Sequence, residues 1–281
     1  MADASLEIKK ILCIIDPTTN QQRALDRAAF MARKSGASVH ALLCFTPPQG
    51  VAAEDGDAML QAEQRRHELW LDELVKPLKV TNVDVTTEVK SSSDWRTALS
   101  QAVRNADADM LIKAASTRSP LRRRLMKTSD WLVLREARCP VLFAKRSDDT
   151  PIAKVLAAVN IAATDEAHVH LTGIVLATGL DVAEQLGAEL NVVNAYADSK
   201  NFIHPPDLAK RAGVSRQQAH VGDADPEDLI ASVCQKIDAG LVIIGSVGRK
   251  GIAAAVVGNT AERILDTVAA DILVIVVPPD A

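Results

Sequence analysis

The sequence predicts an α/β protein of two tandem Rossmann-like domains, each with an open five-stranded parallel sheet and helices on both faces. Three observations predict this fold. The chain has 281 residues, which is long for one hydrophobic core and comfortable for two. Short apolar runs alternate with segments of helical spacing. The pattern of the first half also returns in the second half, as expected for a duplication.

Apolar runs in the first half predict five strands separated by four helices. Because these strands are apolar on both faces, they are typical of a parallel sheet that is covered on both sides. The expected strands are 10–16, 38–45, 83–89, 109–115 and 140–145. The expected helices are near 20–35, 55–76, 94–105 and 128–138.

The second half repeats this order with one shortened connection. The helix between its second and third strands is reduced to PPDLAKRAG, and the charged, proline-containing segment 145–154 is the expected linker. We therefore expect a first domain over 1–148 and a second over 149–281. The strands of the second half are expected at 153–160, 189–196, 216–221, 240–245 and 271–277.

The internal repeat is clearest near the end of each half. Residues 107–145 align without gaps on 238–276, at a constant offset of 131. Few residues are identical, so the repeat depends on the shared pattern of apolar strands and helices.

Composition and charge exclude several classes of protein. Residues 1–150 carry 23 Lys and Arg against 20 Asp and Glu, and residues 151–281 carry 9 against 16. The acidic second half does not fit a general nucleic-acid binder. The N-terminus lacks the features of a signal peptide, and no apolar run is long enough to span a bilayer, so we expect a cytoplasmic protein without a membrane partner. Four widely spaced cysteines predict neither zinc nor a disulfide framework.

A glycine-containing loop follows the fourth strand of the second half. Gly245, Gly248 and Gly258 would let the backbone approach a phosphate closely, while Asn259 and Thr260 are plausible caps of the next helix. Arg249 and Lys250 add positive charge beside the loop. A structural explanation, in which the glycines serve packing and turns and the polar residues only cap the helix, is equally compatible with these residues.

The spacing of this loop resembles the nucleotide loop of the universal stress protein family. Gly245, Gly248 and Gly258 match the family pattern GxxG, nine residues, then glycine. The order of strands and helices in both halves is similar to the tandem UspE type. This resemblance implies the adenine nucleotide α-hydrolase-like fold, a role in stress survival, and ATP or another adenine nucleotide as the ligand.

The resemblance also implies positions for a nucleotide site in the second half. An aspartate that meets the base in ATP-binding members is replaced by Asn160, and the expected Ser or Thr after the last glycine is replaced by Asn259, with Thr260 one place later. Ala195 and Ile244, near the ends of their strands, complete the predicted site. An asparagine can still form hydrogen bonds but lacks the negative charge of a carboxylate.

The first half keeps Asp16 but has lost the glycines of the loop. Ala114, Thr117 and Lys127 stand at the positions of Gly245, Gly248 and Gly258. Side chains there would obstruct a close backbone cradle, so we expect no nucleotide in the first domain.

Three other features have structural and functional interpretations. The cluster Arg118, Arg122–Arg124 and Lys127 could bind an anion, but a solvated or acid-paired loop is favoured. His168 and His170 are two residues apart on a predicted helix and point to different faces, so we expect no metal. The segment 198–213 could open a face of the second sheet to an apolar ligand or a partner, or form a simple lid.

The sequence therefore favours a non-enzymatic stress-response protein with a degenerate nucleotide or phosphate pocket in its second domain. No catalytic residues are predicted, because common catalytic motifs are missing. A slowly ATP-hydrolysing switch and a small-molecule or partner-binding module remain alternatives. The resemblance also implies that the final strands, CPVLFAK and DILVIVV, pair between units, giving an internal pseudo-dimer and a possible homodimer.

Overall fold

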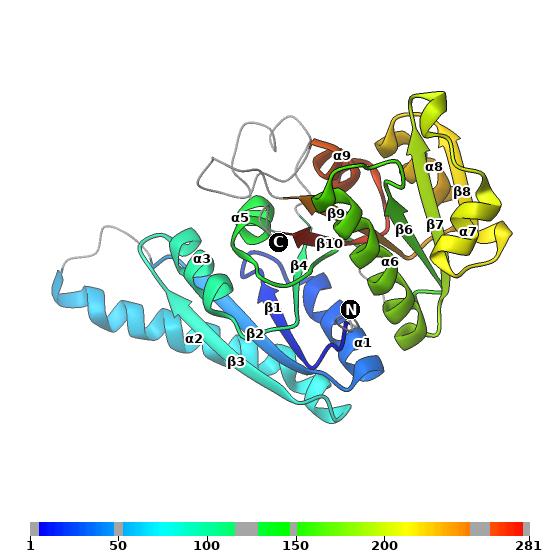
Figure 1. Ribbon diagram of the computed structural model, residues 1–281. Helices are drawn as coiled ribbons and strands as arrows, with labels where there is room; N and C mark the ends of the chain where they lie inside the picture. The colour runs from blue at the N-terminus through cyan, green and yellow to red at the C-terminus, as the bar shows by residue number, and fades with distance from the viewer. Residues whose placement is uncertain (1–5, 48–52, 116–128, 147–150, 248–258, 278–281) are drawn as a thin grey trace. The chain divides into compact units, whose positions relative to one another are not determined.

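The structure is a computed structural model that describes residues 6–47, 53–115, 129–146, 151–247 and 259–277. It divides into two compact units (Figure 1): Ile8–Asp149, called the first unit here, and Thr150–Ala281 together with the N-terminal Met1–Glu7, called the second unit. Leu6 joins the second unit through two hydrogen bonds. Its backbone N–H donates to Asp181 Oδ2 at 2.7 Å, and its carbonyl accepts from Gln185 Nε2 at 2.9 Å.

The first unit alternates strands and helices as the sequence predicts. Its strands are β1 (Lys10–Ile15), β2 (Ser38–Phe45), β3 (Val85–Ser91), β4 (Met110–Ala114) and β5 (Val141–Ala144). Its helices are α1 (Arg23–Ser35), α2 (Ala53–Val80), α3 (Trp95–Asn105) and α5 (Ser129–Glu136).

The second unit has the same alternation around five strands. These are β6 (Lys154–Val159), β7 (Glu189–Tyr196), β8 (Ala219–Asp223), β9 (Leu241–Val247) and β10 (Asp271–Val277). Its helices are α6 (Glu166–Leu186), α7 (Pro205–Ala212), α8 (Pro226–Ile237) and α9 (Asn259–Thr267), with the 3₁₀ turns η1 (Ser199–Asn201) and η2 (Arg216–Gln218) around α7.

Both units have the same sheet topology, which confirms the predicted fold class. The strand order is β3-β2-β1-β4-β5 in the first unit and β8-β7-β6-β9-β10 in the second. Every pair of neighbouring strands within each unit is parallel. In each unit the first three strands form one side of the sheet, and the chain then crosses over to add its last two strands on the other side of the first strand. This crossing creates a topological switch point between β6 and β9, where ligands bind in open α/β sheets.

Local sequence signals set the ends of several helices. Asp94 and Asp165 cap α3 and α6 by accepting hydrogen bonds from the backbone N–H groups of Arg96 and His168. Gly187 ends α6 in the left-handed conformation, with φ of 65°, which glycine adopts without steric cost. Among the described helices, none is long and apolar enough to cross a membrane.

Several predicted boundaries differ from the structure by up to four residues. Strand β3 begins and ends two residues after the expected 83–89, and β8 lies two to three residues after the expected 216–221.

Helix α2 was expected to stop before Pro77, but it continues to Val80, and this last turn keeps Leu78 buried. Pro77 removes one hydrogen bond of the helix, because it has no N–H to donate to the carbonyl four residues earlier. Strand β9 was expected to end at Gly245, but it runs two residues further, since Ser246 and Val247 keep their register with Val276 and Val277.

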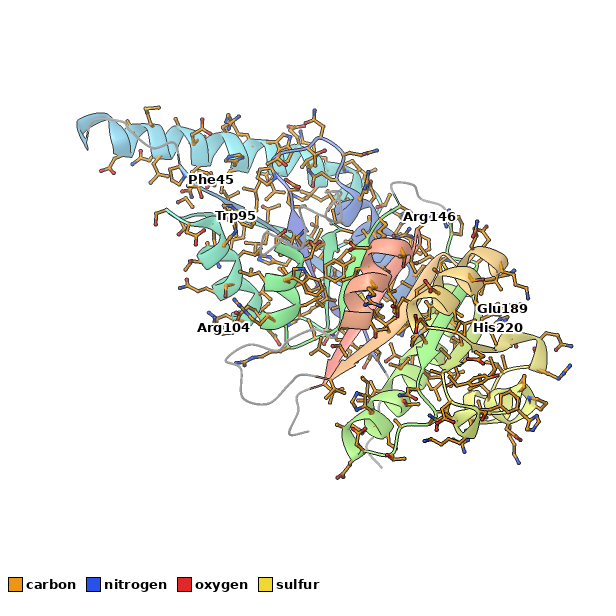
Figure 2. The ribbon with its side chains drawn as sticks, turned by 90° about the horizontal axis from the view of Figure 1, so that it is seen from above. Phe45, Trp95, Arg104, Arg146, Glu189 and His220 are labelled. Atoms are coloured by element: carbon orange, nitrogen blue, oxygen red, sulfur yellow. The ribbon has the colours of Figure 1, made fainter. Side chains whose placement is uncertain are left out.

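The connection between the second and third strands is the main difference between the units. The first unit uses the 28-residue helix α2, which lies along β3 (Figure 1). The second unit uses η1, the eight-residue α7 and η2. Beside this connection, the side chains of Glu189 and His220 lie close together on β7 and β8 (Figure 2).

Candidate functional site

The candidate site lies at the carboxyl ends of β6, β7 and β9. Val159 is in register with Asn194, so Asn160 follows at the level of Ala195. On the other side of β6, Ala157 is in register with Ile243, which puts Asn160 at the level of Ser246. The structure therefore brings Asn160, Ala195 and the end of β9 together at the topological switch point of the second unit.

A buried asparagine holds the loop that carries Asn160. Asn194 is fully buried, and its Oδ1 accepts a hydrogen bond of 2.9 Å from the backbone N–H of Ile161. The carbonyl of Asn160 accepts a further hydrogen bond of 3.1 Å from Thr172 Oγ1. Within the part of the chain that the structure describes, the exposed side chain of Asn160 makes no hydrogen bond. The backbone at Asn160 is thus held in place, and the side-chain amide that it carries is open to a ligand.

Gly245 has a packing reason for lacking a side chain. A Cβ at this position would lie 2.5 Å from Leu171 Cγ and within 2.8 Å of both its Cδ atoms. Leu171 belongs to α6 and is buried, so α6 could not approach β9 this closely above any larger residue. The neighbouring Ile244 is buried, and Ala195 is half-buried. Gly245 therefore lets α6 pack closely on β9, two residues before the strand ends.

The rest of the predicted loop falls partly outside the described residues. Gly248, Arg249 and Gly258 lie there, as does the side chain of Asn259. Helix α9 begins at Asn259, so Thr260 lies in its first turn, with an exposed side chain, and is not the residue before the helix.

An ion pair fixes the first half of α9 against α8. Arg263 of α9 donates to Glu227, a buried carboxylate in the first turn of α8. This hydrogen bond, helped by a backbone hydrogen bond, lowers the pKa of Glu227 below its usual value. The pair positions the helix start that follows the glycine loop.

The first unit fills the equivalent place with a salt bridge. Lys113 Nζ lies 2.7 Å from Asp130 Oδ1, and both side chains are almost buried, at 12% and 11% exposed. With the offset of 131 residues, these positions correspond to Ile244 and Ala261 in the second unit. A lysine and an aspartate thus replace two small or apolar residues beside the end of β4.

Asp16, the carboxylate that the first half keeps after its first strand, already has partners. Its Oδ1 accepts hydrogen bonds from the backbone N–H of Thr18 at 2.9 Å and from Thr18 Oγ1 at 2.6 Å. The loop after β1 is held by Gln22, whose Nε2 donates to the carbonyls of Asp16 and Thr19. Ala114 is half-buried, while Thr117 and the cluster Arg118, Arg122–Arg124 and Lys127 lie outside the described residues.

The histidine pair of the second unit has a local structural role. His168 Nδ1 lies 2.6 Å from Asp165 Oδ1 at the start of α6, and this contact lowers the pKa of Asp165. His170 is exposed. Across the described ranges, there is no group of three His, Cys, Asp or Glu residues that could hold a metal ion.

Comparison with known proteins shows relatives over almost the whole chain. The model of the universal stress protein family matches residues 7–145 and again 147–276. Universal stress protein E of Escherichia coli K12 is 26% identical over 295 residues, covering 95% of this chain and 93% of that protein. The universal stress protein E homolog of Haemophilus influenzae is 25% identical, covering 95% of this chain and 97% of that protein.

Solved structures share the two-unit fold. A functionally unknown protein from Pseudomonas aeruginosa PAO1 has a TM-score of 0.78 and 27% identity, covering 99% of this chain and 96% of that one. A universal stress protein from Archaeoglobus fulgidus has a TM-score of 0.76 and covers 99% of this chain and 100% of that one, but at 15% identity it shows the fold alone. The predicted tandem arrangement is confirmed, and the chain belongs to the universal stress protein family, with one family domain in each half.

Proposed function

We propose that the protein acts in the stress response by binding an adenine nucleotide in its second unit only. The observation that carries this proposal is the exposed amide of Asn160 at the switch point between β6 and β9, on a loop whose backbone Asn194 and Thr172 hold by hydrogen bonds. An exposed polar side chain on a backbone that is held in place suits a binding site.

The other predicted residues would act through the backbone or the helix start. We assign contacts with the base and ribose to Asn160 and to the backbone at Ala195 and Ile244. We assign the phosphates to the loop residues Gly248, Arg249 and Gly258 and to Asn259 and Thr260. Backbone N–H groups at a helix start favour an anion, and glycines, which have no Cβ, allow a ligand to approach the backbone closely.

Binding in the first unit is opposed by its salt bridge. Lys113 and Asp130 would have to separate or leave the end of β4 before a nucleotide could settle there, and separating a nearly buried pair is costly. Asp16 would also have to give up two hydrogen bonds from Thr18. We therefore assign the ligand to one unit of the tandem.

A role in binding fits these residues better than a role in hydrolysis. The residues assigned to the site are asparagines, a threonine, an arginine, glycines and two apolar residues. None of these is a general base at neutral pH, which a hydrolytic reaction would need to activate water. We propose that the nucleotide acts as a signal that the protein senses.

Self-association of the protein stays a prediction, which sedimentation velocity can test.

Titration of ATP into three variants tests the proposed site. Asn160→Ala removes the amide and should weaken binding by about tenfold, the effect of losing one good hydrogen bond. Asn160→Asp restores the carboxylate of the family pattern and should bind more tightly than Asn160→Ala. Asp16→Ala is the matched control in the first unit and should bind like the wild type. Equal affinity of Asn160→Ala and the wild type would refute the assignment.

A further inference from the structure

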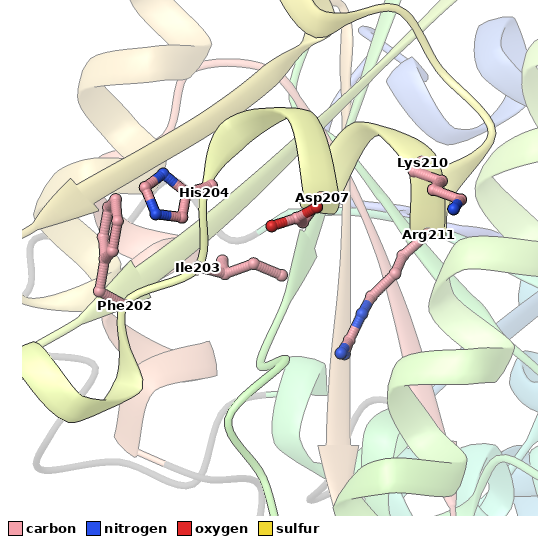
Figure 3. Close-up of a pocket in the computed structure, with 6 residues that line it drawn as sticks. All are labelled: Phe202, Ile203, His204, Asp207, Lys210 and Arg211. Carbon is pink, nitrogen blue, oxygen red and sulfur yellow. The ribbon is translucent and has the colours of Figure 1, made fainter.

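A hollow lies in the shortened connection of the second unit, away from the glycine loop in sequence. Its volume is about 530 Å³, within the usual range of small-molecule sites. It is lined by residues of the turn after η1 and of α7, namely Phe202, Ile203, His204, Asp207, Lys210 and Arg211 (Figure 3). We call it the α7 hollow.

One wall of the α7 hollow is aromatic. The ring of Phe202 makes edge contacts with Tyr196 at 5.4 Å and with His204 at 4.9 Å between centroids. The chain has one tyrosine and four phenylalanines, so two of these five rings gather at this point. Phe202 is nevertheless 42% exposed, which leaves part of its ring free to contact a ligand.

The opposite wall is charged. Figure 3 shows Asp207 extending toward Ile203, between the aromatic pair and Arg211. Within the described part of the chain, the side chains of Asp207, Lys210 and Arg211 form no ion pair and no hydrogen bond, although Lys200 nearby in sequence pairs with Asp198 at 2.9 Å. The hollow therefore presents a ring surface, a carboxylate and a guanidinium in that order.

We propose that the α7 hollow binds a small aromatic zwitterion, that is, an aromatic amino acid or a close analogue. The ring of such a ligand would pack against Phe202 and His204. Its ammonium group would pair with Asp207, and its carboxylate would meet the planar fork of Arg211, which suits a carboxylate. Each part of the hollow then has a matching group on one compact molecule.

The order of charges disfavours other ligands. A nucleotide could stack its base on Phe202, but its phosphates would have to pass Asp207 on the way to Arg211, and like charges repel. A purely apolar ligand would leave Asp207, Lys210 and Arg211 without a partner. This inference does not depend on the nucleotide site, since no residue of the α7 hollow belongs to that site.

Calorimetric titration of the full-length protein with three probes tests the proposal. L-phenylalanine has the ring and both charges, phenylacetate lacks the ammonium group, and phenethylamine lacks the carboxylate. For an open site and a ligand of this size we expect L-phenylalanine to bind with Kd on the order of 1 mM. Phenylacetate and phenethylamine should each bind at least fivefold more weakly.

Variants on the surface separate this site from non-specific binding. Phe202→Ala and Arg211→Gln should each weaken L-phenylalanine about five- to tenfold. Arg216→Gln, which removes an exposed guanidinium of η2 outside the hollow, is the matched control and should bind like the wild type. Far-ultraviolet circular dichroism confirms that each variant is folded. The proposal is wrong if L-phenylalanine does not bind at a concentration about 10-fold above the expected Kd, or if all three probes bind with equal affinity. It is also wrong if Arg211→Gln and Arg216→Gln change the affinity for L-phenylalanine equally.

Discussion

The contact between Gly245 and Leu171 makes the sharpest prediction about the second unit. In Gly245→Ala the new Cβ would lie 2.5 Å from Leu171 Cγ, far inside ordinary contact distance. Leu171 is 6% exposed, so its side chain can relieve the clash only by moving into packed surroundings or by lifting α6 from β9. Overpacking of this kind costs about 1 to 3 kcal/mol. We expect Gly245→Ala to be less stable by that amount.

A double-mutant cycle identifies the clash as the cause. Leu171→Ala alone should cost about 2 to 4 kcal/mol, because it leaves a cavity under α6. In the double variant the new methyl group meets no leucine, so the combined loss should be smaller than the sum by about 1 kcal/mol or more. The matched control is Gly173→Ala, on the exposed side of the same helix, where a Cβ would meet nothing within 4 Å. It should stabilise the helix by about 0.5 to 1 kcal/mol.

Because the chain has two units, the measurement must report on the second unit alone. Hydrogen exchange of the amides in β9 and α6, followed across urea concentrations, gives the free energy of opening for that unit. If Gly245→Ala is as stable as the wild type there, or if the effects of Gly245→Ala and Leu171→Ala simply add, Leu171 is not the reason for the glycine.

Three further predictions concern groups that the sequence did not single out. Lys113→Met removes the nearly buried cation beside Asp130 and should destabilise the first unit by about 3 kcal/mol. The double variant Lys113→Ile with Asp130→Ala copies the second unit and should cost less. Equal losses of stability in urea unfolding would contradict the importance of the buried pair. Asn194→Leu removes the acceptor for the N–H of Ile161 and should lower the stability of the second unit by about 1 to 3 kcal/mol. It should also loosen the Asn160 loop, so that the Ile161 amide exchanges its hydrogen faster. An unchanged exchange rate would contradict this role of Asn194. Burial, and then the charge of Lys236, lowers the pKa of His220, so the unfolded chain takes up a proton that the folded chain resists as pH falls through about 6.5. The stability of the second unit should therefore decline from pH 7.5 to 5.5, and His220→Gln should make this decline less steep. An equally steep decline in His220→Gln would show that other groups cause it.

Strand positions were well predicted because their signal is local. Three strands, β2, β7 and β10, begin and end at the expected residues, since each is rich in apolar residues. The end of α2 was not predicted, because packing of Leu78 outweighs the tendency of Pro77 to end a helix. Local propensity does not show how deeply Leu78 is buried once the unit has folded.

The closeness of Asn160 and Ala195 could be predicted from the sequence, but the side chains that support the Asn160 loop could not. Asn160 and Ala195 could be placed at one sheet edge from the order of the strands. The role of Asn194 depends on a hydrogen bond to the neighbouring loop, and its only sequence signal is a polar residue inside the apolar run ELNVVNAY. The pairing of Lys113 with Asp130 depends on how closely α5 approaches β4, which spacing along the chain does not specify.

The number of nucleotides bound per chain shows whether the protein has one nucleotide site, in its second unit, or one in each unit. Equilibrium dialysis of the full-length protein against labelled ATP, up to millimolar concentration, measures this number for the wild type and for Asn160→Ala. We expect saturation at one ATP per chain in the wild type, with weaker binding in Asn160→Ala. Saturation at two per chain, or no binding at millimolar ATP, would contradict the assignment of a single nucleotide site to the second unit.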